Sequence, residues 1–545
     1  MALALLTACG KQTAAPAAEV NDIIVLYTND VHCGIDENIG YAGLAAYKAA
    51  ALEKTPYVAL VDCGDAIQGD VVGTVSKGEY PVDLMNDVGY DFAVLGNHEF
   101  DYGMTQLKAL IEKSSAQYLA ANITYTGSGE SAIEKTKPYE IVEYGDKKVA
   151  FIGVSTPHSI TSSTPSYFMD ENGSFVYDFC GGDSIDKLAA CVQGYVDECR
   201  TNGADYVIVC AHLGDGEGHS PFTSTELISS TTGIDALLDG HSHSVVSCRI
   251  AQNKNGEDVV VSQTGTKLAN IGQLVITSNG NISTGLISDY AQKDTDEQEY
   301  VDEIKERYEA DTKVVVATSD IALSCSDANG FRLVRNRETA IGDFCADAYR
   351  AVAKADIAFV NGGGIRADLP MGYITYGDLI AVHPFGNTLC SVKATGQQVL
   401  DALEMSARFT QAEQNDGKLA VGESGGFLQV SGFKFTIDTS IASSITTDEN
   451  DMFVSVDGER RVKDVMVLGK DGEYTAIDPA AEYTVASHNY LMQNGGDGMN
   501  MFMNDEFIIN SGMIDCEILI SYITENLDGK LGELYSSTGD RITIK

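Results

Sequence analysis

Five short polar motifs in this 545-residue chain each follow an apolar run, and together they hold five of its nine histidines. In chain order, the residues are Asp30 and His32, Asp65, Asn97 and His98, His212, and His241 and His243. Aspartate and histidine are common ligands of borderline divalent metals, and no cluster of cysteines indicates structural zinc. Each motif alone is a weak signal. The five in this order, in NDVH, DCGD, GNHE, AHLG and GHSH, predict a metal site.

The elements that must position these residues are the strands of an α/β domain. Between residues 22 and 290, apolar runs such as IIVLYT, YVALVD, FAVLGN and YVIVCAH alternate with helical stretches. In α/β sheets, ligands collect at the carboxyl ends of the strands. Five strands that each lead into an Asp, Asn or His can therefore converge on one site.

The rest of the chain suggests two further regions. Residues 292–312 are densely charged, with apolar residues spaced as in a solvated amphipathic helix that bridges two domains. Beyond residue 320, new strand and loop patterns begin. The predicted organisation is a leader and tether at 1–21, a first domain at 22–291, a linker at 292–319 and a second domain at 320–545.

The formal net charge of −43 argues against binding of DNA or RNA polymers, which needs basic surface. An anionic substrate would have to be met locally, by metal ions or a few arginines. The twelve cysteines decide little, because Cys180, Cys191 and Cys199 could form a local disulfide or remain free thiols.

The N-terminal stretch LTACG is similar to a bacterial lipobox, in which Cys9 would be lipidated after signal cleavage. An Ala-rich leader that is cleaved further along is the alternative. No later run is long and apolar enough to span a bilayer. We therefore expect an exported protein, membrane-anchored through Cys9, at the bacterial cell surface or in the periplasm.

The ordered motif set resembles the calcineurin-like metallophosphoesterases, and specifically the two-domain 5′-nucleotidase family of bacteria and animals, from about residue 22 onward. The resemblance implies an N-terminal metallophosphoesterase sandwich and a second α+β substrate-binding domain. It also implies two divalent ions, of Zn, Mn, Co or Fe. One ion would be held by Asp30, His32, Asp65 and His243, and the other by Asp65, Asn97, His212 and His241, so that Asp65 bridges them.

The same resemblance implies that His98 is catalytic. It would stabilise transition-state charge or protonate the leaving oxygen, while Asp101 orients its ring. The alternative is that His98 has a structural role behind the ligands. Glu99 is interpreted as part of the turn. His158 and His219 match no ligand position and are interpreted as loop residues; the alternative for His219 is that it lines the cleft.

Glycine-rich motifs in the second half, NGGGIR, VHPFGNT, GGFLQVSG and NYLMQNGGDGMNMF, resemble the C-terminal substrate domain of 5′-nucleotidases. In that family an aromatic pair holds the base, arginines meet the phosphate side and an Asp grips the ribose. By position, these would be Phe385 and Tyr490, Arg335 and Arg366, and Asp497, with Asn361 and Asn387 flanking the pocket. Arg337 is a second candidate for the role given to Arg335.

These observations predict a phosphohydrolase that releases phosphate from a nucleotide through a metal-bound hydroxide, in the manner of a 5′-nucleotidase. Within the enzyme class, the alternatives are 2′,3′-cyclic-nucleotide 2′-phosphodiesterase with 3′-nucleotidase activity, and hydrolysis of UDP-sugars or dinucleotides. From another class, the alternative is a non-catalytic nucleotide-binding lipoprotein.

Overall fold

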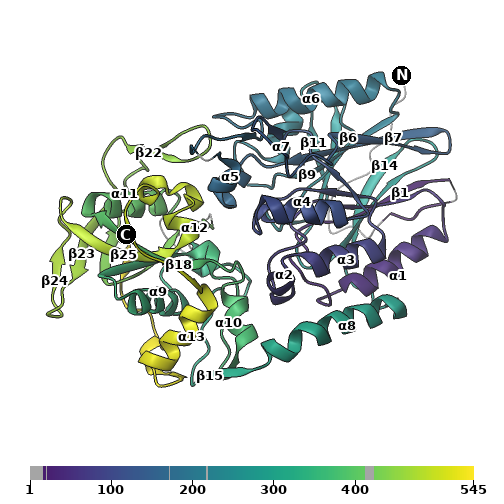
Figure 1. The fold of residues 1–545 in the computed structure, drawn as a ribbon. Coiled ribbons are helices and arrows are strands. Elements are labelled where there is room, and N and C mark those ends of the chain that lie inside the picture. Colours follow the sequence, from purple (N-terminus) through teal and green to yellow (C-terminus); the bar gives the residue numbers. More distant parts are fainter. Residues whose placement is uncertain (1–15, 20, 171, 217–218, 412–422) are drawn as a thin grey trace. The chain divides into compact units, whose positions relative to one another are not determined.

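A computed structural model describes residues 16–19, 21–170, 172–216, 219–411 and 423–545 (Figure 1). Cys9, the predicted lipidation site, lies outside the described residues. The chain divides into two compact units. Unit 1 comprises Met1–Ile160 and Phe168–Arg307, and unit 2 comprises Thr161–Tyr167 and Tyr308–Lys545.

Two six-stranded sheets form the framework of unit 1 (Figure 1). The first has the order β14 (Ile282–Ile287), β13 (Ile271–Ile276), β1 (Ile23–Thr28), β2 (Val58–Asp62), β3 (Phe92–Val94) and β4 (Gln117–Leu119). The second has the order β11 (Val245–Gln252), β12 (Asp258–Thr264), β10 (Ala236–Leu238), β9 (Tyr206–His212), β7 (Lys147–Ser155) and β6 (Tyr139–Tyr144). Neighbours among β1 to β4 pair in parallel, as do β7, β9, β10 and β12 in the second sheet. A short pair, β5 (Thr124–Tyr125) and β8 (Tyr177–Asp178), lies apart from them.

The two sheets of unit 1 pack face to face and are covered by helices. Phe92 of the first sheet stacks on Phe151 of the second, with ring centroids 4.8 Å apart, inside one apolar cluster. The helices up to residue 312 are α1 (Gly40–Leu52), α2 (Val71–Ser76), α3 (Glu79–Val88), α4 (Met104–Lys113), α5 (Ser159–Ser162), α6 (Asp186–Thr201), α7 (Ser224–Ser230) and α8 (Thr295–Thr312). Helix α6 buries Leu188, Val192 and Val196, one stripe at helical spacing, against the second sheet. Burial on both faces explains why the strands read as continuous apolar runs. This arrangement confirms the predicted α/β sandwich.

Helix α8 occupies most of the range predicted as a linker. It buries Val301 and Ile304, while most of its charged residues remain exposed. The division between the two units falls within this helix, after Arg307.

Unit 2 is an α+β assembly of smaller sheets (Figure 1). The five-stranded sheet has the order β19 (Leu428–Ser431), β16 (Ile357–Asn361), β25 (Glu482–His488), β18 (Thr388–Thr395) and β26 (Phe507–Ile514). The others are β24 (Tyr474–Ala476), β23 (Val462–Leu468), β20 (Phe433–Ile437) and β28 (Ile542–Ile544); β17 (Gly372–Thr375), β15 (Val315–Ser319) and β27 (Lys530–Leu531); and the pair β21 (Ile445–Thr447) and β22 (Phe453–Val456). The helices are α9 (Ala340–Ala353), α10 (Tyr376–Val382), α11 (Gly396–Ala407), α12 (Asn489–Met492) and α13 (Asp515–Asn526).

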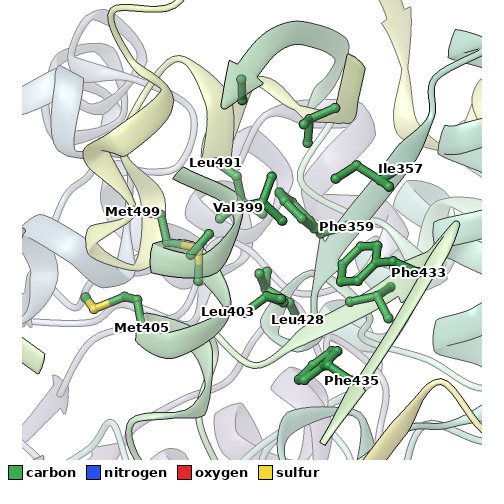
Figure 2. Close-up of a cluster of buried hydrophobic side chains, with 14 of the residues drawn as sticks. Ile357, Phe359, Val399, Leu403, Met405, Leu428, Phe433, Phe435, Leu491 and Met499 are labelled. Atoms are coloured by element: carbon green, nitrogen blue, oxygen red, sulfur yellow. The ribbon is translucent and has the colours of Figure 1, made fainter. Parts of the chain in front are cut away.

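The core of unit 2 joins its five-stranded and four-stranded sheets to α11. Figure 2 shows Phe359 of β16, Leu403 of α11 and Phe433 of β20 within one buried cluster. Strands β16 and β25 pair in parallel, so their last residues, Asn361 and His488, lie at the same edge of the sheet. That edge carries the glycine-rich motifs.

Two further expectations can be compared with the structure. Cys180, Cys191 and Cys199 are free thiols, so of the two possibilities for these cysteines the structure has the unlinked one. Among the described residues, the structure contains no helix with the length and apolar character needed to cross a membrane.

Candidate active site

The predicted metal ligands of unit 1 lie at the carboxyl ends of five parallel strands. Asp30 and His32 follow β1, Asp65 follows β2, Asn97 follows β3, His212 is the last residue of β9, and His241 and His243 follow β10. Strands from both sheets therefore deliver polar side chains to one edge of the sandwich.

The backbone at these ligands is unusual. Five of the seven have positive φ: Asp30 (50°), His32 (45°), Asp65 (60°), His241 (75°) and His243 (54°). Residues other than glycine rarely adopt this left-handed conformation, and they tend to cluster at functional sites. The backbone of these loops is thus held in an unfavourable conformation that the sequence pattern alone does not indicate.

The ligands form two compact groups that could each hold a metal ion. One consists of Asp30, His32 and His243, and the other of Asp65, His212 and His241. Within each group the potential ligand atoms lie within 4.8 Å of one another. The division matches the two ions implied by the family resemblance.

Backbone carbonyls orient two of these histidines. His32 Nδ1 lies 2.8 Å from the carbonyl oxygen of Gln68, and His212 Nδ1 lies 2.7 Å from that of Cys63. A carbonyl oxygen can only accept a hydrogen bond, so Nδ1 carries the proton in each ring. In the neutral ring, the lone pair of Nε2 is then directed into the site, as a metal ligand requires.

Asp65 lies between the two groups. Its Oδ2 is 3.8 Å from His32 Nε2 and 3.1 Å from His212 Nε2, while its Oδ1 accepts the His98 backbone N–H at 2.9 Å. One carboxylate oxygen thus approaches both histidines, which is the placement of a bridging ligand. Asn97 Oδ1 is buried and has no hydrogen-bond partner within the described residues. An orphaned oxygen in a buried acidic site fits a divalent cation.

The pKa shifts at this site also fit a bound cation. Burial raises the pKa of Asp30 to about 7, with a smaller rise from the Asp65 carboxylate, although His212 acts in the opposite direction. Burial would lower the pKa of His212, but the carboxylates of Asp65 and Asp30 raise it to about 10. Binding of a cation would displace that proton and favour the ionised state of Asp30.

Glu99 braces the two loops that carry Asp65 and Asn97. Its Oε2 accepts backbone N–H groups of Asp65 at 2.9 Å and Gly96 at 2.7 Å, and its Oε1 accepts that of Ala66 at 3.0 Å. The side chain is almost completely buried. Glu99 is therefore part of the turn, as expected from the sequence, but it also fixes the position of Asp65.

His98 and Asp101 form a dyad next to the first ligand group. His98 Nδ1 lies 2.5 Å from Asp101 Oδ2, and the ring centroids of His98 and His32 are 5.3 Å apart. Asp101 accepts a hydrogen bond from the Nδ1–H group and favours the imidazolium, so Nε2 is the nitrogen suited to proton transfer. Both side chains retain some exposure, 12% for His98 and 8% for Asp101.

Two histidines without a ligand position also lie in unit 1. The ring of His219 packs against the ring of the predicted ligand His241, with centroids 4.6 Å apart. The ring of His158 packs against Phe222 at 5.1 Å. The contact with His241 fits the alternative that His219 lines the cleft, although no ligand position was assigned to it.

The predicted cationic residues of unit 2 lie in a charged cluster. Arg335 interacts electrostatically with Arg332, Arg366 and Asp497, and its pKa is lowered by burial and by the neighbouring arginines. The Nε of Arg337 instead donates to Asn336. Glu423 was not among the residues predicted from the sequence. Its Oε2 lies 4.0 Å from Nη1 of Arg335.

The aromatic candidates are placed by these charged and polar groups. The guanidinium carbon of Arg366 lies 5.7 Å from the centroid of the Phe385 ring. The Tyr490 hydroxyl accepts the Asp497 backbone N–H at 3.1 Å and donates to the Thr161 carbonyl oxygen at 3.1 Å. A phenylalanine at position 490 would make neither hydrogen bond.

Hydrogen bonds within unit 2 fix the three remaining candidates, Asn361, Asn387 and Asp497. Asn361 Nδ2 donates to Asp497 Oδ2 at 2.8 Å. The Asn387 backbone N–H donates to Asp515 Oδ2 at 3.2 Å, and its carbonyl accepts the Asp515 N–H at 2.8 Å. Unit 2 thus groups Arg335, Asn361, Arg366 and Asp497, while Asn387 is fixed by the buried Asp515.

Comparisons with known proteins show which proteins this chain resembles. A model for the bacterial capsule synthesis protein PGA_cap matches residues 52–290, and a model for the 5′-nucleotidase C-terminal domain matches residues 315–504. The solved structure of a 5′-nucleotidase precursor from Thermus thermophilus superposes with a TM-score of 0.77 and 25% identity, over 96% of this chain and 99% of that one. Unit 1 is thus the calcineurin-like phosphoesterase fold, followed by a 5′-nucleotidase C-terminal domain.

Two relatives are similar to this chain over most of its length. The trifunctional nucleotide phosphoesterase protein YfkN of Bacillus subtilis is 27% identical over 95% of this chain, which spans only 35% of that relative's length. The cell wall protein Lmo0130 of Listeria monocytogenes is 26% identical over 94% of this chain and 68% of the relative. These matches confirm the predicted resemblance to the two-domain 5′-nucleotidases, in the domain architecture and in the names of the relatives.

Proposed function

We propose that this chain releases phosphate from nucleotides as a 5′-nucleotidase, at a site in unit 1 that binds two divalent cations. The observation that carries the proposal is the position of Asp65, whose Oδ2 approaches histidines of both ligand groups. Two cations in such a site supply water of lowered pKa and positive charge for the phosphoryl oxygens. Zn, Mn, Co or Fe would each suit these nitrogen and oxygen donors.

The residues of the protein complete the reaction. Asp30, His32 and His243 would hold one ion, and His212, His241 and Asn97 the other, with Asp65 shared. His98 would donate a proton from Nε2 to the leaving ribose oxygen, since Asp101 stabilises its protonated form. The partly exposed position of His98 supports this role.

Unit 2 would select the nucleoside. Phe385 and Tyr490 would stack on the base, while Arg335 and Arg366 would attract the phosphate. Asp497 would accept hydrogen bonds from the ribose hydroxyls, and Asn361 and Asn387 would complete the pocket. The clustering of arginines supports this reading, because the net charge of −43 offers an anion few other favourable surfaces.

We further propose export and a lipid anchor on Cys9, supported by the lipobox-like LTACG and by a relative that is named a cell wall protein.

A broader substrate range is a second candidate for the function. It is favoured by the relative described as a trifunctional nucleotide phosphoesterase.

The test compares hydrolysis of 5′-AMP, 3′-AMP, 2′,3′-cyclic AMP and UDP-glucose by the full chain. We expect the highest kcat/KM for 5′-AMP. The variant His98→Ala tests the catalytic role of this histidine. It should lower kcat by about 10²- to 10⁴-fold without loss of bound metal. Comparable kcat/KM values for two or more of the four compounds would favour the second candidate. Equally poor hydrolysis of all four compounds would contradict the nucleotide assignment.

A further inference from the structure

Three side chains of unit 2 form a chain of hydrogen bonds that starts at a histidine not used by the mechanism. His488 ends β25, Asn361 ends β16, and Asp497 lies in a short 3-10 turn. His488 Nε2 lies 3.1 Å from Asn361 Oδ1, and Asn361 Nδ2 lies 2.8 Å from Asp497 Oδ2. His488 and Asn361 are 1% and 4% exposed.

Chemistry fixes the direction of each hydrogen bond. A carboxylate only accepts, so the Asn361 group facing Asp497 must be its NH₂. The Asn361 carbonyl oxygen then faces His488, whose Nε2 must carry a proton. His488 Nδ1 accepts the Leu491 backbone N–H at 3.4 Å, which is consistent with the neutral ring. Burial and the nearby His383 lower the pKa of His488 to about 3, so the ring stays neutral near pH 7.

The glycine-rich motifs leave room for these side chains. A Cβ at Gly364 would lie 2.8 Å from Asn361 Oδ1, and one at Gly426 would lie 2.9 Å from Asp497 Cβ. Side chains at either position would therefore displace a member of the chain. Two motifs identified in the sequence, NGGGIR and GGFLQVSG, thus have a packing reason at this point.

Asp497 is also fixed through its backbone. Its φ is +55°, and its N–H donates to the Tyr490 hydroxyl. Burial raises the pKa of Asp497 to about 6, opposed by Arg408, Asn361 and Arg335, so the carboxylate is ionised at neutral pH. With Oδ2 held by Asn361, the direction of the second carboxylate oxygen is set.

We propose that His488 is a positioning residue for nucleoside recognition. Its Nε2–H locks the Asn361 amide in the orientation that holds Asp497 ready to accept ribose hydroxyls. Without this donor, the Asn361 amide could rotate and present its oxygen to the carboxylate, which would repel it. The proposal rests on the proposed nucleotidase function, because it needs a ribose as the ligand of Asp497.

The test uses two variants of the full chain. His488→Leu removes the donor, whereas His488→Gln can place an amide N–H where Nε2 lies. For 5′-AMP, the Leu variant should raise KM about tenfold with little change in kcat, since one buried polar group loses its partner. The Gln variant should remain within about threefold of wild type. Affinity for adenosine, measured by calorimetry on the metal-stripped chain, should fall in parallel with the rise in KM.

A matched substrate isolates the ribose. In 2′,3′-dideoxy-AMP the hydroxyls are missing, so the Leu variant and the wild type should show the same KM for it within about twofold. If the Leu substitution raises KM equally for both substrates, or for neither of them, the positioning role is wrong. If the Leu variant does not fold, His488→Met, which has no N–H or O–H group to donate, is compared with His488→Gln. Equal KM values for that pair would also overturn the proposal.

The proposed function fails separately, in the wild-type protein. A wild-type chain that neither hydrolyses 5′-AMP nor binds adenosine contradicts the nucleotidase assignment. A wild-type chain that does both, with a Leu variant that is equally good, contradicts only the role of His488.

Discussion

Glu99 illustrates what can and cannot be read at the scale of single residues. The side chains that gather in the candidate site could be predicted, because Asp, Asn and His recur after apolar strands in an informative order. The bracing by Glu99 could not, because it depends on where three backbone N–H groups point after folding. The role of His488 was hidden for the same reason, since its partner Asn361 lies 127 residues away.

Glu99→Gln tests the brace. Glutamine keeps one acceptor oxygen but turns an NH₂ group toward backbone donors, so the loop bearing Asp65 should loosen. We expect metal affinity to fall by about 10- to 100-fold, the usual cost of losing a group that supports a ligand. Calorimetric titration of the metal-stripped chain measures it. Glu112→Gln, on the surface of α4, is the control, and indistinguishable affinities in the two variants would refute the brace.

At the scale of elements, local patterns predicted unit 1 better than unit 2. Strands of unit 1 that pair in parallel lie in apolar runs separated by helices, which the sequence shows directly. In unit 2, β20 pairs with β28, about a hundred residues further along, and no local pattern indicates such a partner. Nor does any pattern mark Thr161–Tyr167 as part of unit 2.

Helix α8 carries a pH-sensitive residue in its first turn. Burial, together with Asp87 and Asp294, raises the pKa of Glu297 from 4.5 to about 9. Between these values the folded chain holds a proton that the unfolded chain has released. The free energy of unfolding therefore falls as pH rises from 4.5 to 9, by at most about 1.4 kcal/mol per pH unit and by less where solvent screens the carboxyl.

Glu297→Gln removes this titration. Thermal unfolding at pH 5, 7 and 9 should show a shallower loss of stability in the variant than in the wild type. Glu303, an exposed residue of the same helix, supplies the control Glu303→Gln. Parallel curves for Glu297→Gln and wild type would show that the buried carboxyl does not stay protonated.

For the whole molecule, charge explains why the function needs local cations. A chain with 79 acidic and 36 basic side chains repels anions in general, yet its site in unit 1 concentrates carboxylates and histidines. Unit 2 gathers arginines near Asp497. Composition could predict that substrate charge must be met locally. Only the fold shows that Asp65 lies where two cations could share it.

The most direct test is a metal titration of the stripped full chain, with bound metal and 5′-AMP hydrolysis followed together. The stripped chain should be inactive, and activity should return in step with binding of about two ions per chain. Asp65→Asn should weaken binding of both ions and lower turnover sharply. Turnover by the metal-free chain, full activity with one ion, or an Asp65→Asn variant that keeps both ions and full rate would contradict the account.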